Sequence, residues 1–255
     1  TTKKSYILED PAQTCDILEE AINIAYYGRP GPFHIHVPKN ITGAEVPNFR
    51  EIELDIKPYA PKPETVTAFV NKLKEDLNQG RQVGLLFGYG CVSSHAKEEL
   101  IEFVEKFQIP FMSTMDAKGL LPEDHSLSLG VYGTSGDPGA NDYFDKADTI
   151  LAIGNSFAQN ATFNFKEDLY AGKTLMQINI DRNEINKVYR ADYALVSDAK
   201  LALEEINDKL AQEIKQVERA AIKRDKWYDK EIDYEGDRIH PAELVRTLSD
   251  NLPQD

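Results

Sequence analysis

Apolar runs bounded by glycine, proline or charged residues recur through the middle of the chain. Residues 83–87, VGLLF, carry no polar side chain, which is typical of a strand buried on both faces of a parallel sheet. Similar runs predict strands at residues 109–113, 149–153 and 175–180, and a further extended segment at 188–196. Apolar residues at helical spacing predict helices at residues 64–79, 93–107, 140–145 and 200–210.

This alternation of strands and helices predicts an α/β fold: a doubly wound, mainly parallel sheet covered by helices on both faces. We assign a Rossmann-like central domain to residues 63–211. Within it, Ser93 and Ser94 are candidate caps for the helix that follows the first strand. Residues 116–142, DAKGLLPEDHSLSLGVYGTSGDPGAND, are expected to form a long irregular excursion rich in turn residues.

Partial elements flank this domain on both sides. Residues 1–45 contain an Asp10-Pro11 helix start and a short alternating strand at 33–37, too little for an independent domain. We interpret them as the C-terminal end of a preceding domain, joined by a proline-rich linker at residues 46–62.

On the other side, residues 212–236 are highly charged and are interpreted as a second linker. Residues 237–255 then predict the first helix of a following domain. Pro241 suits the first helical position, and Leu244, Val245 and Leu248 are expected to face inward.

Charge and composition exclude several classes of partner. A net charge of −14 and a pI near 4.9 argue against nucleic acids and anionic membranes. The two cysteines, Cys15 and Cys91, lie in dissimilar contexts and predict neither a disulfide framework nor a zinc site. No apolar run approaches the ~18 residues that a membrane span needs, so we expect a cytoplasmic protein.

Gly88-Tyr89-Gly90-Cys91-Val92-Ser93 forms G-x-G-x-x-S, one residue short of the dinucleotide-binding fingerprint. That fingerprint also needs an acidic residue about 20 positions further on, and Asp116 lies somewhat too far. A structural turn or a different nucleotide-binding mode therefore explains these glycines better than standard nicotinamide-dinucleotide binding.

The loops after the predicted strands are expected to converge, because such sheets bind ligands outside the carboxyl ends of their strands. They carry Gly88, Gly90, Thr114, Met115, residues 154–160 and Asp181. No catalytic or metal-binding residue is assigned. His34 and His36 lack an evident third ligand, and the segment around Asp124 and His125 is better explained as a turn.

Five segments point to one known family: AINIAYYGRPGPFHIHVPKNI (21–41), PFMSTMDAKGLLPEDHSLSLGVYG (110–133), ADTILAIGNSF (147–157), QINIDRNEINKVY (177–189) and IHPAELVRTLSDNLPQD (239–255). Together they resemble, in the same order, the thiamine-diphosphate-dependent acetolactate synthases, pyruvate oxidases and related 2-keto-acid decarboxylases. The second, third and fourth segments resemble the central domain of that family, and the first and last resemble the adjoining ends of its neighbouring domains.

The resemblance implies a whole enzyme that uses thiamine diphosphate and Mg²⁺, decarboxylates 2-keto acids such as pyruvate, and assembles as a homodimer or homotetramer. The family's cofactor-activating glutamate would lie upstream of Thr1, and its GDG...N metal motif downstream of Asp255. We therefore expect an inactive fragment with a scaffold and subunit-contact role, which needs no cofactor of its own.

Some members of the family bind FAD or ADP in the central domain, which leaves both open here. Carried over by position, the contacts would come from Gly88, Tyr89, Gly90, Thr114, Met115, Val131, Gly133, Gly154, Asn155, Ser156, Asn160, Asn179 and Asp181. Flavin-binding members have R-F-D-D-R where this chain has Ser156, Phe157, Ala158, Gln159 and Asn160. Asn179 replaces their ribose-binding aspartate. The missing charges argue against a flavin diphosphate.

Two other hypotheses stay open. The chain could be a free-standing module that binds ADP, FAD or NADP through the Gly88 turn. It could also be an interaction domain whose exposed apolar ends dimerise.

Overall fold

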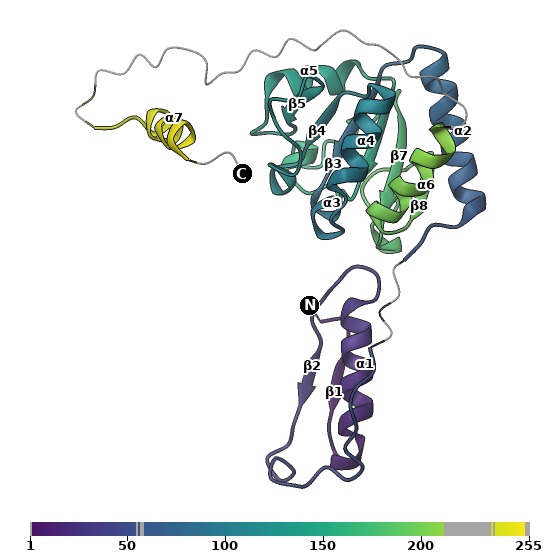
Figure 1. Ribbon diagram of the computed structural model, residues 1–255, viewed down its shortest axis with the longest axis vertical. Coiled ribbons are helices and arrows are strands. Elements are labelled where there is room, and N and C mark those ends of the chain that lie inside the picture. The colour runs from purple at the N-terminus through teal and green to yellow at the C-terminus, as the bar shows by residue number, and fades with distance from the viewer. Residues whose placement is uncertain (1, 55, 57–58, 212–235, 237, 253–255) are drawn as a thin grey trace.

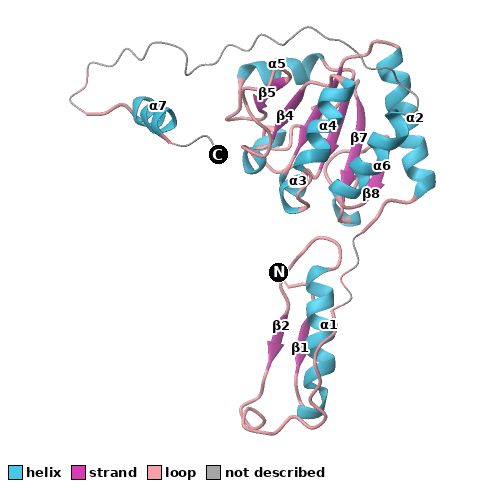
Figure 2. Ribbon diagram, viewed as in Figure 1, coloured by secondary structure: helices cyan, strands magenta, loops and turns pink. Residues whose placement is uncertain are grey.

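A six-stranded parallel sheet forms the centre of the molecule (Figures 1 and 2). The computed structural model describes residues 2–54, 56, 59–211, 236 and 238–252. The strands are β3 (Val83–Phe87), β4 (Phe111–Ser113), β5 (Ser128–Val131), β6 (Thr149–Ile153), β7 (Thr174–Asn179) and β8 (Tyr193–Val196). Their order is β5-β4-β3-β6-β7-β8, and every pair is parallel. The predicted doubly wound α/β fold is confirmed.

Two hydrophobic cores cover the two faces of this sheet. The helices are α2 (Pro63–Asn78), α3 (Tyr89–Ser93), α4 (Lys97–Phe107), α5 (Pro138–Lys146) and α6 (Ala199–Ala211), with 3₁₀ turns η2 (Met115–Ala117), η3 (Asn160–Thr162) and η4 (Arg182–Glu184). One core joins the sheet to α2, α4 and α6. The other joins it to α5 and to aromatic side chains of the loops after β6 and β7, among them Phe157, Tyr170 and Tyr189.

The two longest apolar runs have the bounds that the sequence predicts. β3 and β6 cover residues 83–87 and 149–153, and all ten positions are buried. Two other expectations are wrong. The stretch 116–142 is not irregular throughout, because β5 lies inside it and pairs with β4. Ser93 and Ser94 do not cap a helix: α3 already begins at Tyr89, and α4 begins at Lys97 after Ala96, without a side-chain cap.

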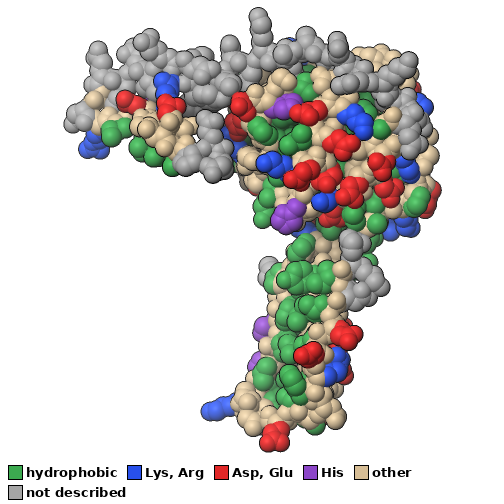
Figure 3. Space-filling view, viewed as in Figure 1, with side chains coloured by type: hydrophobic (Ala, Val, Ile, Leu, Met, Phe, Trp, Pro, Cys, Tyr) green, Lys and Arg blue, Asp and Glu red, His purple; other side chains and the backbone are tan. Residues whose placement is uncertain are grey.

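The N-terminal segment forms a small unit of its own below the sheet in Figure 1. Parallel strands β1 (Ser5–Ile7) and β2 (His34–His36) pack beside α1 (Thr14–Tyr26), which follows the 3₁₀ turn η1 (Pro11–Gln13). Asp10 accepts a hydrogen bond from the Ala12 amide and begins the helical segment as predicted. Figure 3 shows apolar side chains gathered on the visible face of this unit, whereas acidic side chains are scattered over the central unit.

Helix α7 (Pro241–Asn251) confirms the predicted C-terminal helix, with Pro241 in its first turn. Its apolar face differs from the expectation, because Leu244, Val245 and Leu248 are 49%, 65% and 49% exposed rather than turned inward. The predicted linker at 212–236 lies almost wholly outside the described residues.

Tyr170, which is buried in the second core, should make the stability of the protein depend on pH in the alkaline range. Burial raises the pKa of its hydroxyl well above the ordinary value. Since the folded-state pKa exceeds the unfolded one, the stability that the neutral hydroxyl contributes is complete below a pH of about 10 and is lost as the pH rises further. The free energy of unfolding should then fall by up to about 1.4 kcal/mol per pH unit from this group.

Replacing Tyr170 by phenylalanine should make this fall shallower. Urea unfolding at a pH of about 8 and about 11 measures it. Tyr26→Phe is the control, because Tyr26 is 55% exposed and its removal should leave the slope unchanged. A Tyr170→Phe protein that loses stability as steeply as the parent would contradict the prediction.

Candidate functional site

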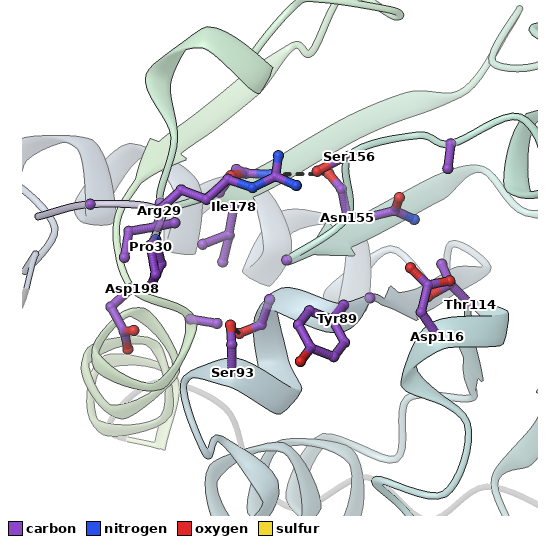
Figure 4. A pocket seen from close by; sticks show the side chains of 18 of the residues that line it. Arg29, Pro30, Tyr89, Ser93, Thr114, Asp116, Asn155, Ser156, Ile178 and Asp198 are labelled. Atoms are coloured by element: carbon purple, nitrogen blue, oxygen red, sulfur yellow. Dashed lines mark hydrogen bonds between the residues drawn. The ribbon is translucent and has the colours of Figure 1, made fainter. Parts of the chain in front are cut away.

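A cleft of about 670 Å³ lies at the carboxyl ends of β3 and β6 (Figure 4). β3 is the first strand of the sheet along the chain, and its two neighbours are β4 and β6. The strand order therefore reverses between β3 and β6, and open α/β sheets bind their ligands at such a switch point. The loops after β3, β4, β6, β7 and β8 all reach this cleft.

Glycines form the floor of the cleft because two loops touch there backbone to backbone. A Cβ atom on Gly88 would lie 2.6 Å from the Gly154 carbonyl oxygen, and one on Gly90 would lie 2.5 Å from the Gly154 Cα. The Gly88 amide donates to Ile153 O (2.9 Å), and the Gly90 amide donates to Gly154 O (2.9 Å). These glycines thus serve loop packing, and their two amides are already hydrogen-bonded.

Two predicted site asparagines tie loops together. The Asn179 side chain donates to Asn155 O (3.1 Å) and accepts from the Asp181 amide (2.9 Å). Asn160 Oδ1 accepts from the Ser135 amide at 3.3 Å. The amide groups of both side chains therefore shape the loops around the cleft.

Thr114 and Asn155 are different, because each keeps one buried polar atom without a partner. Thr114 is 5% exposed and Asn155 is 3% exposed. Asn155 Oδ1 accepts from the Phe157 amide (2.7 Å), but Asn155 Nδ2 and Thr114 Oγ1 have no hydrogen-bond partner among the described residues. Such groups point to a missing partner, since buried polar atoms are nearly always hydrogen-bonded.

The N-terminal unit and the segment before α2 close one side of the cleft. Arg29 lies 3.4 Å from the buried carboxylate of Glu184. The Tyr59 carbonyl accepts hydrogen bonds from the Asp198 amide (2.8 Å) and from Ser197 Oγ (3.0 Å). Residues far apart in the sequence therefore meet at the mouth of the cleft.

The charges that line the cleft do not suit a phosphate chain. Among its described lining residues, Arg29 is the single lysine or arginine, and Asp116 and Asp198 carry the opposite charge. The Asp198 side chain already caps the N-terminus of α6, where its Oδ1 accepts a hydrogen bond from the Lys200 amide (2.9 Å). Beneath the floor, burial raises the pKa of the Cys91 thiol, so this cysteine stays protonated and unreactive.

Most of the predicted site residues come together in the cleft. Its lining includes Gly88, Tyr89, Gly90, Thr114, Met115, Gly154, Asn155, Ser156, Asn160 and Asn179. Three do not line it. Val131 is buried in β5, the Gly133 amide bonds Asn141, and Asp181 lines a neighbouring cleft of about 760 Å³ beside the N-terminal unit. Ligand contacts at all these positions stay a prediction.

Sequence reasoning missed the lining residues that come from outside the four loops it considered. Ser197 and Asp198 follow β8, and Arg29 and Tyr59 precede the central sheet. A signal existed for the first pair, because β8 is one more parallel strand whose loop must open at the same edge. Local patterns carry no signal for the second pair, whose position depends on packing between units.

The three histidines that the sequence singles out have different surroundings. His34 and His36 lie exposed on β2, and the described residues contain no group of three or more potential metal ligands. His125 Nδ1 accepts from the Leu127 amide (3.1 Å) within its turn. In the described part of the chain, no helix is long and apolar enough to cross a membrane.

Comparison with known proteins agrees with this architecture. A family model for the central domain of thiamine pyrophosphate enzymes matches residues 70–206. The chain belongs to this family. Among curated thiamine pyrophosphate enzyme relatives, a probable acetolactate synthase large subunit of Methanocaldococcus jannaschii is 31% identical over 98% of this chain and 44% of its own length. The acetolactate synthase large subunit of Lactococcus lactis is 31% identical over 79% of this chain and 35% of its own length.

A solved structure supports the fold assignment. The crystal structure of benzoylformate decarboxylase from Polynucleobacter necessarius matches with a TM-score of 0.80 at 23% identity, over 100% of this chain and 46% of that protein. At this identity the likeness shows the fold alone. The chain thus spans less than half the length of these relatives.

The family implies thiamine diphosphate and Mg²⁺, but the described residues do not fit them. A Mg²⁺-diphosphate group needs oxygen ligands for the metal and free donors for the phosphates. The described residues offer no cluster of acidic or histidine ligands, and the amides of Gly88 and Gly90 are already bonded. We derive no catalytic step through that cofactor within these residues.

Proposed function

We propose that this chain serves as the central domain, with adjoining segments, of a larger acetolactate synthase-like enzyme. Residues 63–211 are the domain itself, 1–45 the end of a pyrimidine-binding domain, 46–62 and 212–236 linkers, and 237–255 the start of a diphosphate-binding domain. The observation that carries the proposal is the first relative's match, which covers 98% of this chain but 44% of that protein.

In the proposed whole enzyme this part acts as a scaffold. The contact of Arg29 with Glu184 links the N-terminal unit to the central unit, and the hydrogen bonds to the Tyr59 carbonyl hold the segment before α2 against the loop after β8. Thiamine diphosphate and Mg²⁺ would bind to the neighbouring domains, where 2-keto acids such as pyruvate would be decarboxylated and joined. We expect that enzyme to be a cytoplasmic homodimer or homotetramer.

Exposed apolar side chains on both flanking units support the subunit-contact role. They include Ile7, Tyr27, Val245 and Leu252, each at least 60% exposed. Large apolar groups that face solvent in this number commonly mark interaction surfaces.

Titration calorimetry tests the proposed inactivity of the chain. We expect no saturable binding of thiamine diphosphate with Mg²⁺ to the 255-residue chain, because the described residues lack a metal-ligand cluster. Mg²⁺ without the cofactor serves as the control titration. A Kd below about 10 μM would contradict the proposal.

A second candidate function is nucleotide binding in the cleft. The position of the cleft at the switch point favours it, and thermal shift with ADP, FAD and NADP measures it. The absence of stabilisation at high excess of all three would argue against a nucleotide-binding module.

A further inference from the structure

Two histidines lie next to each other on an exposed face of the N-terminal unit. His34 and His36 are two residues apart on β2, and both are exposed, whereas Ile35 between them is half-buried. Side chains two residues apart on a strand point to the same face, with their Cβ atoms about 6.6 Å apart. Figure 3 shows histidine side chains along the margin of this unit where Figure 1 places β2. The two imidazoles therefore share one open surface.

The ring nitrogens of this pair are not engaged elsewhere. Neither imidazole has a hydrogen-bond or ion-pair partner among the described residues. Other histidines differ in this respect. In the turn before β5, His125 Nδ1 accepts from the Leu127 amide (3.1 Å), and at the start of α7, His240 accepts from a backbone amide. A neutral imidazole has one nitrogen lone pair that can bind a metal ion, so the β2 pair offers two.

The backbone holds the two histidines in fixed positions. The His34 amide donates to Lys4 O (3.1 Å). The Leu8 amide donates to His36 O (2.9 Å). Between the two, Ile35 is paired with a buried residue of β1. Two ligands that are held in this way lose little conformational freedom when they bind a common ion.

The surroundings of the pair favour a cation. Ser5 and Ile7 lie opposite the two histidines in the ladder between β1 and β2, so neither opposing position carries a charge. The nearby basic side chains are committed to α1. Lys3 Nζ donates to carbonyl oxygens at the C-terminal end of this helix, and Lys4 is paired with Glu20. The net charge of −14 also attracts cations at long range.

The ligand type restricts the metal to a divalent transition ion. Imidazole suits Cu²⁺, Ni²⁺ and Zn²⁺, whereas Mg²⁺ and Ca²⁺ prefer oxygen ligands. The part of the chain that the structure describes contains no group of three or more histidine, cysteine or acidic ligands. Water would therefore complete the coordination sphere, as it does at open metal sites.

We propose that His34 and His36 form a two-histidine chelate for a divalent transition-metal ion on the outer face of β2. Neither histidine lines the cleft at the carboxyl ends of β3 and β6. The inference goes beyond the proposed function and does not depend on the central-domain role.

Titration calorimetry of the 255-residue chain with Cu²⁺, Ni²⁺, Zn²⁺ and Mg²⁺ tests the proposal. We expect saturable binding of one Cu²⁺ per chain, weaker binding of Ni²⁺ and Zn²⁺ in the usual order of affinities, and no saturable binding of Mg²⁺. Electron paramagnetic resonance of the Cu²⁺ complex should show nitrogen ligands. The absence of saturable binding by all three transition metals at about 1 mM would overturn the proposal.

Substitution of the two histidines tests the assignment of the ligands. His34→Gln and His36→Gln should each weaken Cu²⁺ binding by about tenfold or more, because a single imidazole cannot chelate. The doubly substituted protein should lose the site. The matched control is His95→Asn in the turn after α3, where His95 is exposed and has a φ of +54°, which asparagine tolerates.

The folded state of each variant is checked by circular dichroism. Both β2 histidines are exposed, so their replacement should change the melting temperature of the metal-free protein by no more than about 2 °C. An unchanged Cu²⁺ affinity in the folded, doubly substituted protein would overturn the assignment. So would an equal loss of affinity in His95→Asn.

Discussion

Replacing Asp76 by alanine is expected to lower the free energy of unfolding by about 3–5 kcal/mol, the usual cost of removing one partner from a buried ion pair. Asp76 is fully buried in the last turn of α2. Its carboxylate lies 2.9 Å from Lys72 Nζ and 3.4 Å from Arg81 Nε, and it accepts a hydrogen bond from Thr149 Oγ1 at 2.8 Å. The substitution would leave the mostly buried Lys72 ammonium without this partner.

The location of the Asp76 cluster explains why the effect should be large. Thr149 is the first residue of β6, so the carboxylate joins α2 to the amino-terminal end of this strand, opposite the cleft at its carboxyl end. Hydrogen bonding to Asp76 also raises the pKa of Lys72, so the contact favours the charged form of the ammonium group. Loss of the carboxylate should therefore loosen α2 as well as remove the pair.

Urea unfolding followed by circular dichroism measures the Asp76→Ala effect. The matched control is Asp142→Ala, which breaks an ion pair with Lys146 whose two side chains are both 65% exposed. Exposed helical pairs of this kind contribute about 0.3–0.5 kcal/mol. The prediction fails if the two alanine variants lose similar stability.

Gly154→Ala is expected to lower the free energy of unfolding by about 4 kcal/mol, or to prevent folding, because a backbone strain and a steric clash add. Gly154 has a φ of +62°, in the left-handed region that favours glycine. An added Cβ would also lie 2.7 Å from both the Cys91 amide nitrogen and the Gly90 Cα. Both contacts are with backbone, so no side-chain rotation can relieve them, and the loops after β3 and β6 would have to separate.

Gly172→Ala isolates the backbone penalty from the steric one. Gly172 has a φ of +75°, but nothing lies within 4 Å of the position of an added Cβ. The Gly172→Ala substitution should therefore lower the free energy of unfolding by about 1 kcal/mol, which is the strain of an alanine in the left-handed region. Thermal unfolding of both variants gives the comparison, and equal losses would show that the contact between the two glycine loops is unimportant.

The sequence predicts the inner strands well and the outer ones poorly, for a physical reason. β3 and β6 are buried on both faces, so their composition is apolar throughout and their ends coincide with turn residues. β5 is a four-residue edge strand, SLGV, with a serine and a glycine. It owes its extended form to hydrogen bonds with β4, which no local pattern records.

The sequence likewise predicts one part of the candidate site well and another part poorly. The sequence places Thr114 and Asn155 in converging loops, because the carboxyl ends of parallel strands share one edge. It leaves open whether Gly88 serves a structural turn or nucleotide binding, and in the structure this glycine makes close contact with Gly154. Both uses need a residue without a side chain, so the G-x-G pattern alone does not separate them. The hydrogen-bond partners of the Gly88 and Gly90 amides distinguish the two uses.

The hydrogen bonds to the Tyr59 carbonyl also bear on the order in which parts of the protein fold during synthesis. Ser197 Oγ reaches Tyr59 across 138 residues of sequence, so the ribosome must deliver the last strand of the sheet before this contact can form. Contacts of such long sequence separation form late, since loop-closure entropy must be overcome first. We therefore expect the mouth of the cleft to be completed after the sheet itself, and the Asp198 amide to gain protection from hydrogen exchange last. A ligand would then find its site only when the whole sheet has emerged.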